Sequence, residues 1–227
     1  MATTKNGKTS RLAAALAAEG VESTGLIHIA PLEERVARFK IVGASGYLQL
    51  AFSEKAKNTM MASQSQGSKK GTRKAREARD WDEDYRQAMH VSTEGWNGIP
   101  ATAIKAAAIS ACRLCGVVMT RAKILLHVKP EGFDRVSGDP LVQIYGQPEK
   151  HTSAVRNATG VADIRVRAFW REWHAFVNVA YDAASIGPED VLALLYRAGR
   201  QVGIGEGRPD SKKSCGMGLG LFDVEIA

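Results

Sequence analysis

The most informative stretch of the sequence is Gly203-Ile-Gly205-Glu-Gly207-Arg208-Pro209-Asp-Ser-Lys212-Lys213-Ser-Cys-Gly216-Met-Gly218-Leu-Gly220. Six glycines and three cations fall within these eighteen positions. Glycine adopts positive φ at little cost and lets a second backbone approach closely, so the loop suits a phosphate chain or a neighbouring subunit. We therefore predict that its glycines serve binding more than folding. The alternative interpretation is a surface loop that closes a sheet.

The elements on either side of this glycine loop are a predicted helix, Pro188–Gln201, and a short predicted strand, Leu221–Ile226. Pro188 suits the first position of the helix, and Gly203 suits its end. Dinucleotide and Walker-type loops follow a strand and open a helix, and the GxxxxGK[ST] spacing is missing from this loop. The order of elements therefore excludes both kinds of nucleotide-binding loop.

The composition predicts a folded protein with one strongly basic segment. The 227 residues are 44% hydrophobic, which is enough for a sizeable core. The net charge is +7, and the same excess lies between Lys55 and Arg79, where Glu77 is the single acid. This segment has little to bury, so we predict a flexible loop that holds a phosphate backbone without reading bases; a solubilising loop is the alternative. Its cations are Lys55, Lys57, Lys69, Lys70, Arg73, Lys74, Arg76 and Arg79.

The three cysteines do not predict a disulfide framework or a metal site. Cys112 and Cys115 lie on a predicted helix at the spacing of its apolar face, so we expect both to be buried. Cys215 has no matching CxxC or HxxxH partner. We therefore expect a reducing, cytoplasmic compartment and no metal or other cofactor.

Residues 1–25 are predicted to form an N-terminal arm with a short helix rather than a signal peptide. Ser10 suits the start of that helix and Gly20 its end, while the apolar run between them is short and mostly alanine. No stretch approaches the length that spans a bilayer, so no membrane partner is expected.

Residues 26–227 are predicted to form one α+β domain with a flexible basic insertion over 53–90. Two β segments, 36–42 and 47–52, meet at Gly43–Gly46 through a hairpin turn or a bulge. Strands 165–170 and 174–181 are predicted to pair as a hairpin, and 141–145 is a short strand. The main elements follow the β-α-β-β-α-β order of a ferredoxin-like (RRM-like) antiparallel sheet. They are 36–52, 100–116, 123–129, 174–181, 188–202 and 218–226.

Two segments carry a resemblance to a known family: the glycine loop before the last strand, and Asn97-Gly-Ile-Pro-Ala-Thr-Ala-Ile-Lys105 at the start of the first helix. With the predicted topology they resemble the RAMP superfamily, the nucleic-acid-binding backbone subunits and ribonucleases of CRISPR systems. The resemblance implies a ferredoxin-like palm whose insertions grip a guide or target strand and whose glycine loop contacts RNA. The chain lacks a tandem second domain, and its loop is longer and more polar. Three origins stay open: a CRISPR subunit, a virus-encoded relative such as a phage protein, and a parallel invention.

Catalytic patterns are weak. The five histidines, among them His127 and His174 within predicted strands, are scattered and lack metal-ligand spacing. The acidic cluster Asp80–Asp84 lacks the pattern of a calcium loop and is interpreted as a solvated face that balances its basic neighbour. No Gly-x-Ser-x-Gly elbow occurs. We therefore interpret the protein as a binder rather than an enzyme.

The predicted nucleic-acid-binding residues extend beyond the basic segment. Trp96 is expected to stack on a base, whereas core filling is favoured for Trp170 and Trp173. The further predicted site residues are Lys105, Arg156, Arg165, Arg167, Gly203, Gly205, Gly207, Arg208, Lys212, Lys213, Gly216 and Gly218.

The leading hypothesis is a cytoplasmic, non-enzymatic protein that coats single-stranded RNA or DNA, with RNA favoured. It would assemble side by side as a homo-oligomer, with or without other effector subunits. The alternative is a viral structural or assembly protein whose basic loop and N-terminal arm contact neighbouring subunits. A RAMP-type endoribonuclease ranks lower because no local motif selects a histidine.

Overall fold

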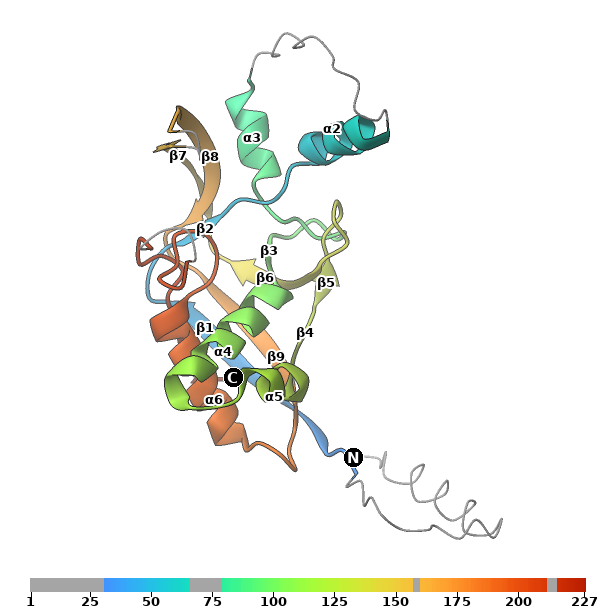
Figure 1. The fold of residues 1–227 in the computed structure, drawn as a ribbon, viewed down its shortest axis with the longest axis vertical. Coiled ribbons are helices and arrows are strands. Elements are labelled where there is room, and N and C mark those ends of the chain that lie inside the picture. Colours follow the sequence, from blue (N-terminus) through green and yellow to red (C-terminus); the bar gives the residue numbers. More distant parts are fainter. Residues whose placement is uncertain (1–30, 66–78, 157–159, 212–215) are drawn as a thin grey trace, which may run out of the picture. The chain divides into compact units, whose positions relative to one another are not determined.

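A computed structural model describes residues 31–65, 79–156, 160–211 and 216–227, without the side chains of Lys55 and Arg156 (Figure 1). The chain divides into two compact units, Met1–Leu32 and Glu33–Ala227, and every element below belongs to the second. The predicted N-terminal arm lies outside the described residues. Within the described ranges, every helix is too short or too polar to cross a membrane.

The unit has an α+β fold, as predicted, with two antiparallel sheets in the described residues. The centre of the larger sheet is β9 (His174–Asp182), which pairs with β1 (Glu34–Gly43) on one side. The other edge of β9 is shared by β4 (Leu126–Lys129) and β6 (Pro140–Tyr145). The remaining strands are β10 (Phe222–Ile226) beside β1, and β3 (Gly98–Pro100) and β5 (Gly132–Phe133) beside β6.

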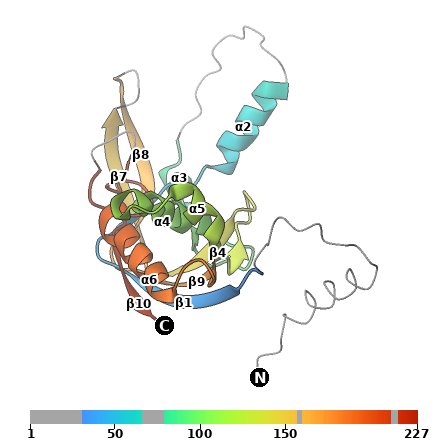
Figure 2. The ribbon, with the colours of Figure 1, turned by 60° about the horizontal axis from the view of Figure 1, so that its bottom comes forward.

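Helices cover one face of the larger sheet, as Figure 2 shows. The long helix α4 (Ala101–Cys115) buries a stripe that includes Ile104 and Ala111, as its apolar spacing predicts. Helix α6 (Pro188–Arg197) has Pro188 in its first turn and continues into the π-helical segment η1 (Ala198–Val202). These helices pack on the alternate residues of β1 and β9 that are buried: Phe39, Ile41, Ala175, Val177 and Val179.

Two local predictions in this layer were wrong. Cys112 is buried, but Cys115 in the last turn of α4 is exposed, because the helix ends at Gly116 and no described element covers that turn. The strand predicted from residue 123 begins at Leu126 instead, because α5 (Met119–Leu125) takes the preceding residues. Ala122 is the buried residue of this short helix.

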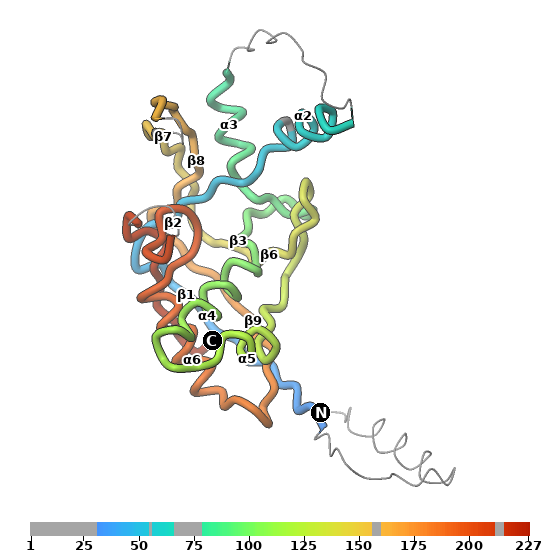
Figure 3. The backbone as a smooth tube through the Cα atoms, viewed as in Figure 1, coloured from blue at the N-terminus to red at the C-terminus, as the bar shows by residue number. Residues whose placement is uncertain are grey.

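A bent two-stranded ribbon joins the two sheets (Figure 3). Val42 pairs with His174 in the larger sheet, and Tyr47 pairs with Trp170 in the smaller one. Residues 43–46 on one strand therefore stand opposite residues 171–173 on the other, which is the unequal count of a bulge. This confirms the bulge rather than the hairpin turn between the two N-terminal β segments.

The predicted hairpin of strands 165–170 and 174–181 was wrong. The first lies in β8 (Ala162–Trp170), which pairs with β2 (Tyr47–Gln49) and β7 (Pro148–Arg156) in the smaller sheet. The second lies in β9, whose two edges are taken by other strands. Trp170 and Trp173 flank the bend and are both buried, which confirms their predicted core role.

The basic insertion carries helices where the sequence predicted a flexible loop. Helix α2 (Glu54–Ser65) has no glycine or proline, and the Ser53 hydroxyl accepts a hydrogen bond from the amide of Ala56 at its start. Helix α3 (Trp81–Gln87) begins at the N-cap Asp80, whose carboxylate accepts from two amides. Residues 66–78, which hold Lys69, Lys70, Arg73, Lys74 and Arg76, lie outside the described part.

Candidate functional site

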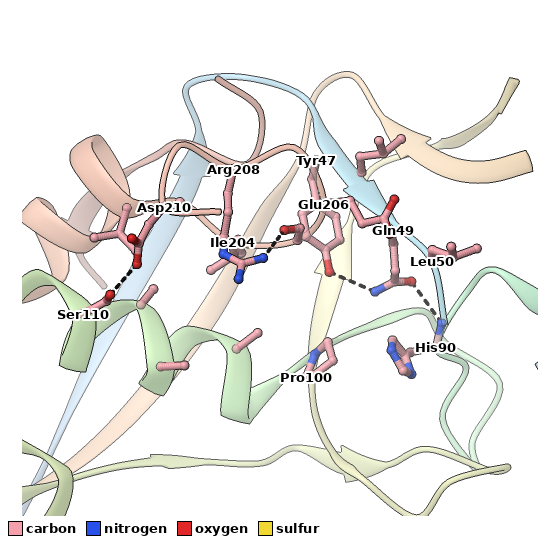
Figure 4. Close-up of a pocket in the computed structure, with 17 residues that line it drawn as sticks. Tyr47, Gln49, Leu50, His90, Pro100, Ser110, Ile204, Glu206, Arg208 and Asp210 are labelled. Atoms are coloured by element: carbon pink, nitrogen blue, oxygen red, sulfur yellow. Dashed lines mark hydrogen bonds between the residues drawn. The ribbon is translucent and has the colours of Figure 1, made fainter. Parts of the chain in front are cut away.

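A cleft of about 410 Å³ lies between the N-terminal half of α4, strand β2 and the glycine loop (Figure 4). The α4 wall consists of small side chains, Ala103, Ala106 and Ser110, on the face of the helix that the core does not use. Pro100 is the N-cap of α4 and lines the cleft, and no described side chain caps the amides of the first turn. The cleft therefore presents a smooth wall and an uncapped helix N-terminus.

The opposite wall is the first half of the glycine loop, which lies against β2. The amide of Glu206 donates to the carbonyl of Leu48 over 2.9 Å. A Cβ on Gly205 would stand 2.5 Å from the ring of Tyr47 and 2.6 Å from the Leu48 carbonyl oxygen. Glycine is therefore required at position 205 for the loop to reach β2.

Arg208 is the cation of this cleft. Its side chain reaches back over the loop, where one guanidinium nitrogen donates to the Gly205 carbonyl over 2.9 Å. It forms no ion pair with a carboxylate among the described residues, although its charge helps to lower the pKa of Asp210. The remaining N–H groups of Arg208 can therefore bind an anion that enters the cleft.

One end of the cleft is an ordered polar network around Gln49. Its amide donates to the Tyr47 hydroxyl over 3.0 Å and to the Gly98 carbonyl over 2.9 Å, and its oxygen accepts from the His90 amide. Burial raises the pKa of the Tyr47 hydroxyl. The network fixes the backbone of His90 beside Pro100 (Figure 4).

The ring of His90 is held by a buried carboxylate. Its Nδ1 lies 2.8 Å from Asp134 Oδ2, and the other oxygen of Asp134 accepts from the amides of Val136 and Ser137. Burial acts to raise the pKa of Asp134, but the amide hydrogen bonds and His90 outweigh it, so the pKa is lowered. The Asp134 carboxylate therefore orients the ring of His90, and His90 lines the cleft.

The other end of the cleft ties the glycine loop to α4. The Ser110 hydroxyl donates to Asp210, and Arg113 donates to the second Asp210 oxygen over 2.7 Å. The Ser110 hydrogen bond, followed by Arg113, lowers the pKa of the Asp210 carboxyl. Asp210 therefore closes the cleft as an anchor rather than as a ligand-binding group.

Three predicted cations are engaged by the protein itself. Arg167 is buried on β8 and pairs with Glu206 and with the Ser153 hydroxyl, so it was wrongly placed on a nucleic-acid track. Arg79 pairs with Asp84 and Asp163 and packs on the ring of Trp81. The nearest carboxylate oxygen of Asp163 is 3.9 Å from Arg165, which is half-buried.

Two further predicted cations and Trp96 lie apart from the cleft. Lys57 is on α2, with its Nζ 3.5 Å from the Val136 carbonyl, and Lys105 is on α4, with its Nζ 3.2 Å from His127. Trp96 is half-buried, and its ring covers Gly98 and Gly132. Lys212, Lys213 and the side chains of Lys55 and Arg156 are outside the described part.

The glycines of the loop serve folding more than we predicted. All six have positive φ. A Cβ on Gly216 would stand 2.8 Å from the Arg208 carbonyl oxygen and from Pro209 Cα, and one on Gly203 or Gly207 would meet protein atoms at 3.2 Å. Gly218 differs, because no described atom lies within 4 Å of its Cβ position. The close approaches at the other positions are to the protein's own atoms rather than to space that a ligand could enter.

The acidic cluster is an ion-pair surface. Asp82 pairs with Lys150 over 2.6 Å, Glu83 with Arg86 over 2.8 Å, and Asp84 with Arg79 over 2.7 Å. Within the described ranges, no three His, Cys, Asp or Glu side chains are grouped to hold a metal ion. Two of the cations that pair with the acidic cluster, Arg86 and Lys150, lie outside the basic segment 55–79.

Sequence reasoning missed His90, Asp134, Gln49, Ser110 and Asp210 as parts of one site. They come from segments far apart in the chain, and no spacing between them forms a motif. The only local signal was the proximity of Asp210 to Arg208 in the glycine loop. Compared with known proteins, the chain matches no protein-family model and no curated protein sequence.

Proposed function

We propose that this protein binds single-stranded nucleic acid, with RNA favoured, and that the cleft holds part of the strand. The observation that carries the proposal is that the guanidinium of Arg208 and the uncapped N-terminus of α4 belong to the same cleft. A helix N-terminus and an arginine without a carboxylate partner among the described residues both favour a phosphate group. The basic segment would supply the wider electrostatic attraction.

The strand order supports a ferredoxin-like palm as the framework. Strands β10, β1, β9 and β4 are neighbours in that order, and all their pairings are antiparallel. Helix α4 precedes β4 in the chain, and α6 lies between β9 and β10. This is the arrangement that the proposed RAMP-like relationship requires. The fold admits many functions, so the cleft and its charges have to support the binding proposal.

Side-by-side assembly on a strand and a cytoplasmic location belong to the same proposal. A protein that covers a strand by charge binds with little sequence preference and loses affinity as salt rises. A viral assembly protein would instead form oligomers without nucleic acid. Sedimentation with and without a single-stranded RNA separates these two outcomes.

The test is the salt dependence of RNA binding by the full-length protein. Changing Lys69, Lys70, Arg73 and Lys74 together to alanine should flatten the plot of log affinity against log salt by about 0.7 for each phosphate that is no longer neutralised. Arg208→Ala should weaken binding at every salt concentration. The control is Arg35→Ala, which removes an exposed cation 3.9 Å from Glu33 at the start of β1 and should leave binding unchanged. An unchanged slope and affinity in both test variants would contradict the proposal.

A second candidate function is RNA cleavage, because the Asp134–His90 pair adjoins the same cleft. His90 would accept the proton of a ribose 2′-hydroxyl as that oxygen attacks the adjacent phosphorus, and the departing 5′-oxygen would take a proton from water. Arg208 would stabilise the charge on the phosphorus oxygens. Incubation with RNA should then yield 2′,3′-cyclic phosphate ends, which His90→Asn abolishes and His127→Ala does not. Intact RNA with the wild-type protein would exclude this activity.

A further inference from the structure

We propose that the open face of the larger sheet is a second contact surface for single-stranded nucleic acid, on which bases stack against Tyr145, His174 and Phe176. This inference rests on the proposed function, but it concerns a different face of the protein. Helices α4 and α6 cover the other side of the sheet (Figure 2).

The alternation of β9 places two rings on the open face. Ala175, Val177 and Val179 are buried toward the helices, so His174 and Phe176 point the other way and are half-buried. Tyr145 on β6 pairs in register with His174 and is 36% exposed. The three rings therefore meet on adjacent strands, where no described helix or strand lies over them.

The rings form an ordered aromatic cluster. Tyr145 and His174 stack with centroids 4.9 Å apart and an interplanar angle of 9°. Phe176 meets both edge-on, at 6.0 Å from each centroid. Rings that already brace one another lose little side-chain freedom when a flat base stacks on them. Stacking on aromatic rings is the sequence-tolerant means by which proteins bind unpaired bases.

Two cations, Arg38 and Lys40, lie beside the aromatic cluster. The Arg38 guanidinium carbon lies 4.8 Å above the Phe176 ring, and Arg38 forms no ion pair among the described residues. Lys40 pairs in register with Phe176 and reaches Glu225 over 3.2 Å. An exposed pair of this kind contributes little, so a phosphate can replace the carboxylate. Arg38 is therefore the cation of this face that has no carboxylate partner among the described residues, and its place beside flat rings favours a polyanion with bases over a neutral apolar partner.

A shallow groove of about 880 Å³ continues from the rings along this face. Lys40, Tyr145 and His174 line one part of it. The turn regions contribute Gly146, Arg171 and the acidic residues Glu149 and Glu172, and Arg171 pairs with Glu149 over 3.2 Å. Gly146 has a φ of 134°, and a Cβ there would collide with the Glu172 carbonyl. Position 146 therefore requires glycine, and no side chain projects into the groove from it. The groove gives a strand room to run past Tyr145 and His174, beside Lys40.

The test compares two probes of equal length and charge, a labelled oligouridine RNA and an abasic ribose-phosphate oligomer. Tyr145→Ala, His174→Ala and Phe176→Ala should each weaken oligouridine binding about tenfold, equivalent to about 1.4 kcal/mol. Affinity for the abasic probe should not change. Tyr145→Phe should bind as the wild type does. The control Tyr196→Ala removes a ring that is 48% exposed on α6 and should have no effect.

A second measurement needs no variant. Wild-type protein irradiated with RNA that contains 4-thiouridine should form crosslinks to peptides that contain Tyr145 or the segment His174–Phe176. The inference is overturned if folded alanine variants bind oligouridine normally, or if no crosslink maps to this face. It is also overturned if the variants change only the sedimentation of the protein, since the face would then be a subunit interface. Wild-type protein that binds neither probe would overturn the proposed function as well.

Discussion

The buried guanidinium of Arg167 on β8 forms an ion pair with Glu206 in the glycine loop. The pair links the smaller sheet to the loop that forms one wall of the cleft. Arg167 has 9% of its side chain exposed, and Glu206 has 38%. The cleft wall is therefore held by a charge pair, and one of its members, Arg167, was predicted from the sequence to bind nucleic acid.

Removing Glu206 should destabilise the fold more than removing a surface partner. Glu206→Gln leaves the buried Arg167 without its counter-charge, and we expect a loss of about 2 kcal/mol in the free energy of unfolding. The matched control is Glu149→Gln, whose partner Arg171 is 71% exposed, with an expected change of about 0–1 kcal/mol. Urea titrations measure both values, and equal losses would contradict the structural role of the Arg167–Glu206 pair.

Two neighbouring glycines should behave in opposite ways. Gly220→Ala places a Cβ against the Ile204 carbonyl, so the loop must move and we expect a loss of at least about 2 kcal/mol. Gly218→Ala meets no described atom within 4 Å and should cost about 1 kcal/mol, from its positive φ alone. Thermal and urea unfolding measure the loss of unfolding free energy in each variant. A larger loss at Gly218 would show that the loop packs differently.

The stability should depend on Asp210 at acidic pH. The Ser110 hydroxyl and Arg113 lower the folded-state pKa of Asp210, so its contribution is complete above the unfolded value of about 3.9. That contribution is lost as the pH falls through the folded pKa. The unfolding free energy of Asp210→Asn should therefore fall less steeply below about pH 4 than that of the wild type. If the unfolding free energies of the wild type and of Asp210→Asn fall in parallel as the pH is lowered, the predicted contribution of Asp210 is contradicted.

The two helical cysteines should differ in reactivity. Burial raises the pKa of the Cys112 thiol, whereas Cys115 is exposed at the end of α4. We expect iodoacetamide to modify Cys115 at least about ten times faster than Cys112 in the native protein. Trypsin cleaves at Arg113 between them, so mass spectrometry of the two peptides reads each rate separately. Denatured protein, in which the rates should converge, is the control.

The structural features that could be predicted from the sequence are those that depend on interactions between residues close together in the chain. The helix that begins at Pro188 and the strand after the glycine loop have local causes: a proline in the first turn, a periodic apolar stripe and a glycine stop. The stripe of α4 followed in the same way. Trp170 and Trp173 are buried as predicted, although the hairpin from which their burial was expected does not form. The helix α2 was missed because composition indicated disorder, although its twelve residues contain no helix breaker.

Sequence alone therefore determined the α+β class, the basic segment and the glycine loop, because periodicity, charge and glycine content are properties of neighbouring residues. Tertiary structure decided which strands pair. The sequence predicts a hairpin of residues 165–170 and 174–181. In the structure, the bulge at residues 43–46, opposite 171–173, places these two strands in different sheets. It also decided that Arg167 faces Glu206 and that His90 faces Asp134. Those contacts join residues 39 and 44 positions apart, and no local propensity encodes such a distance.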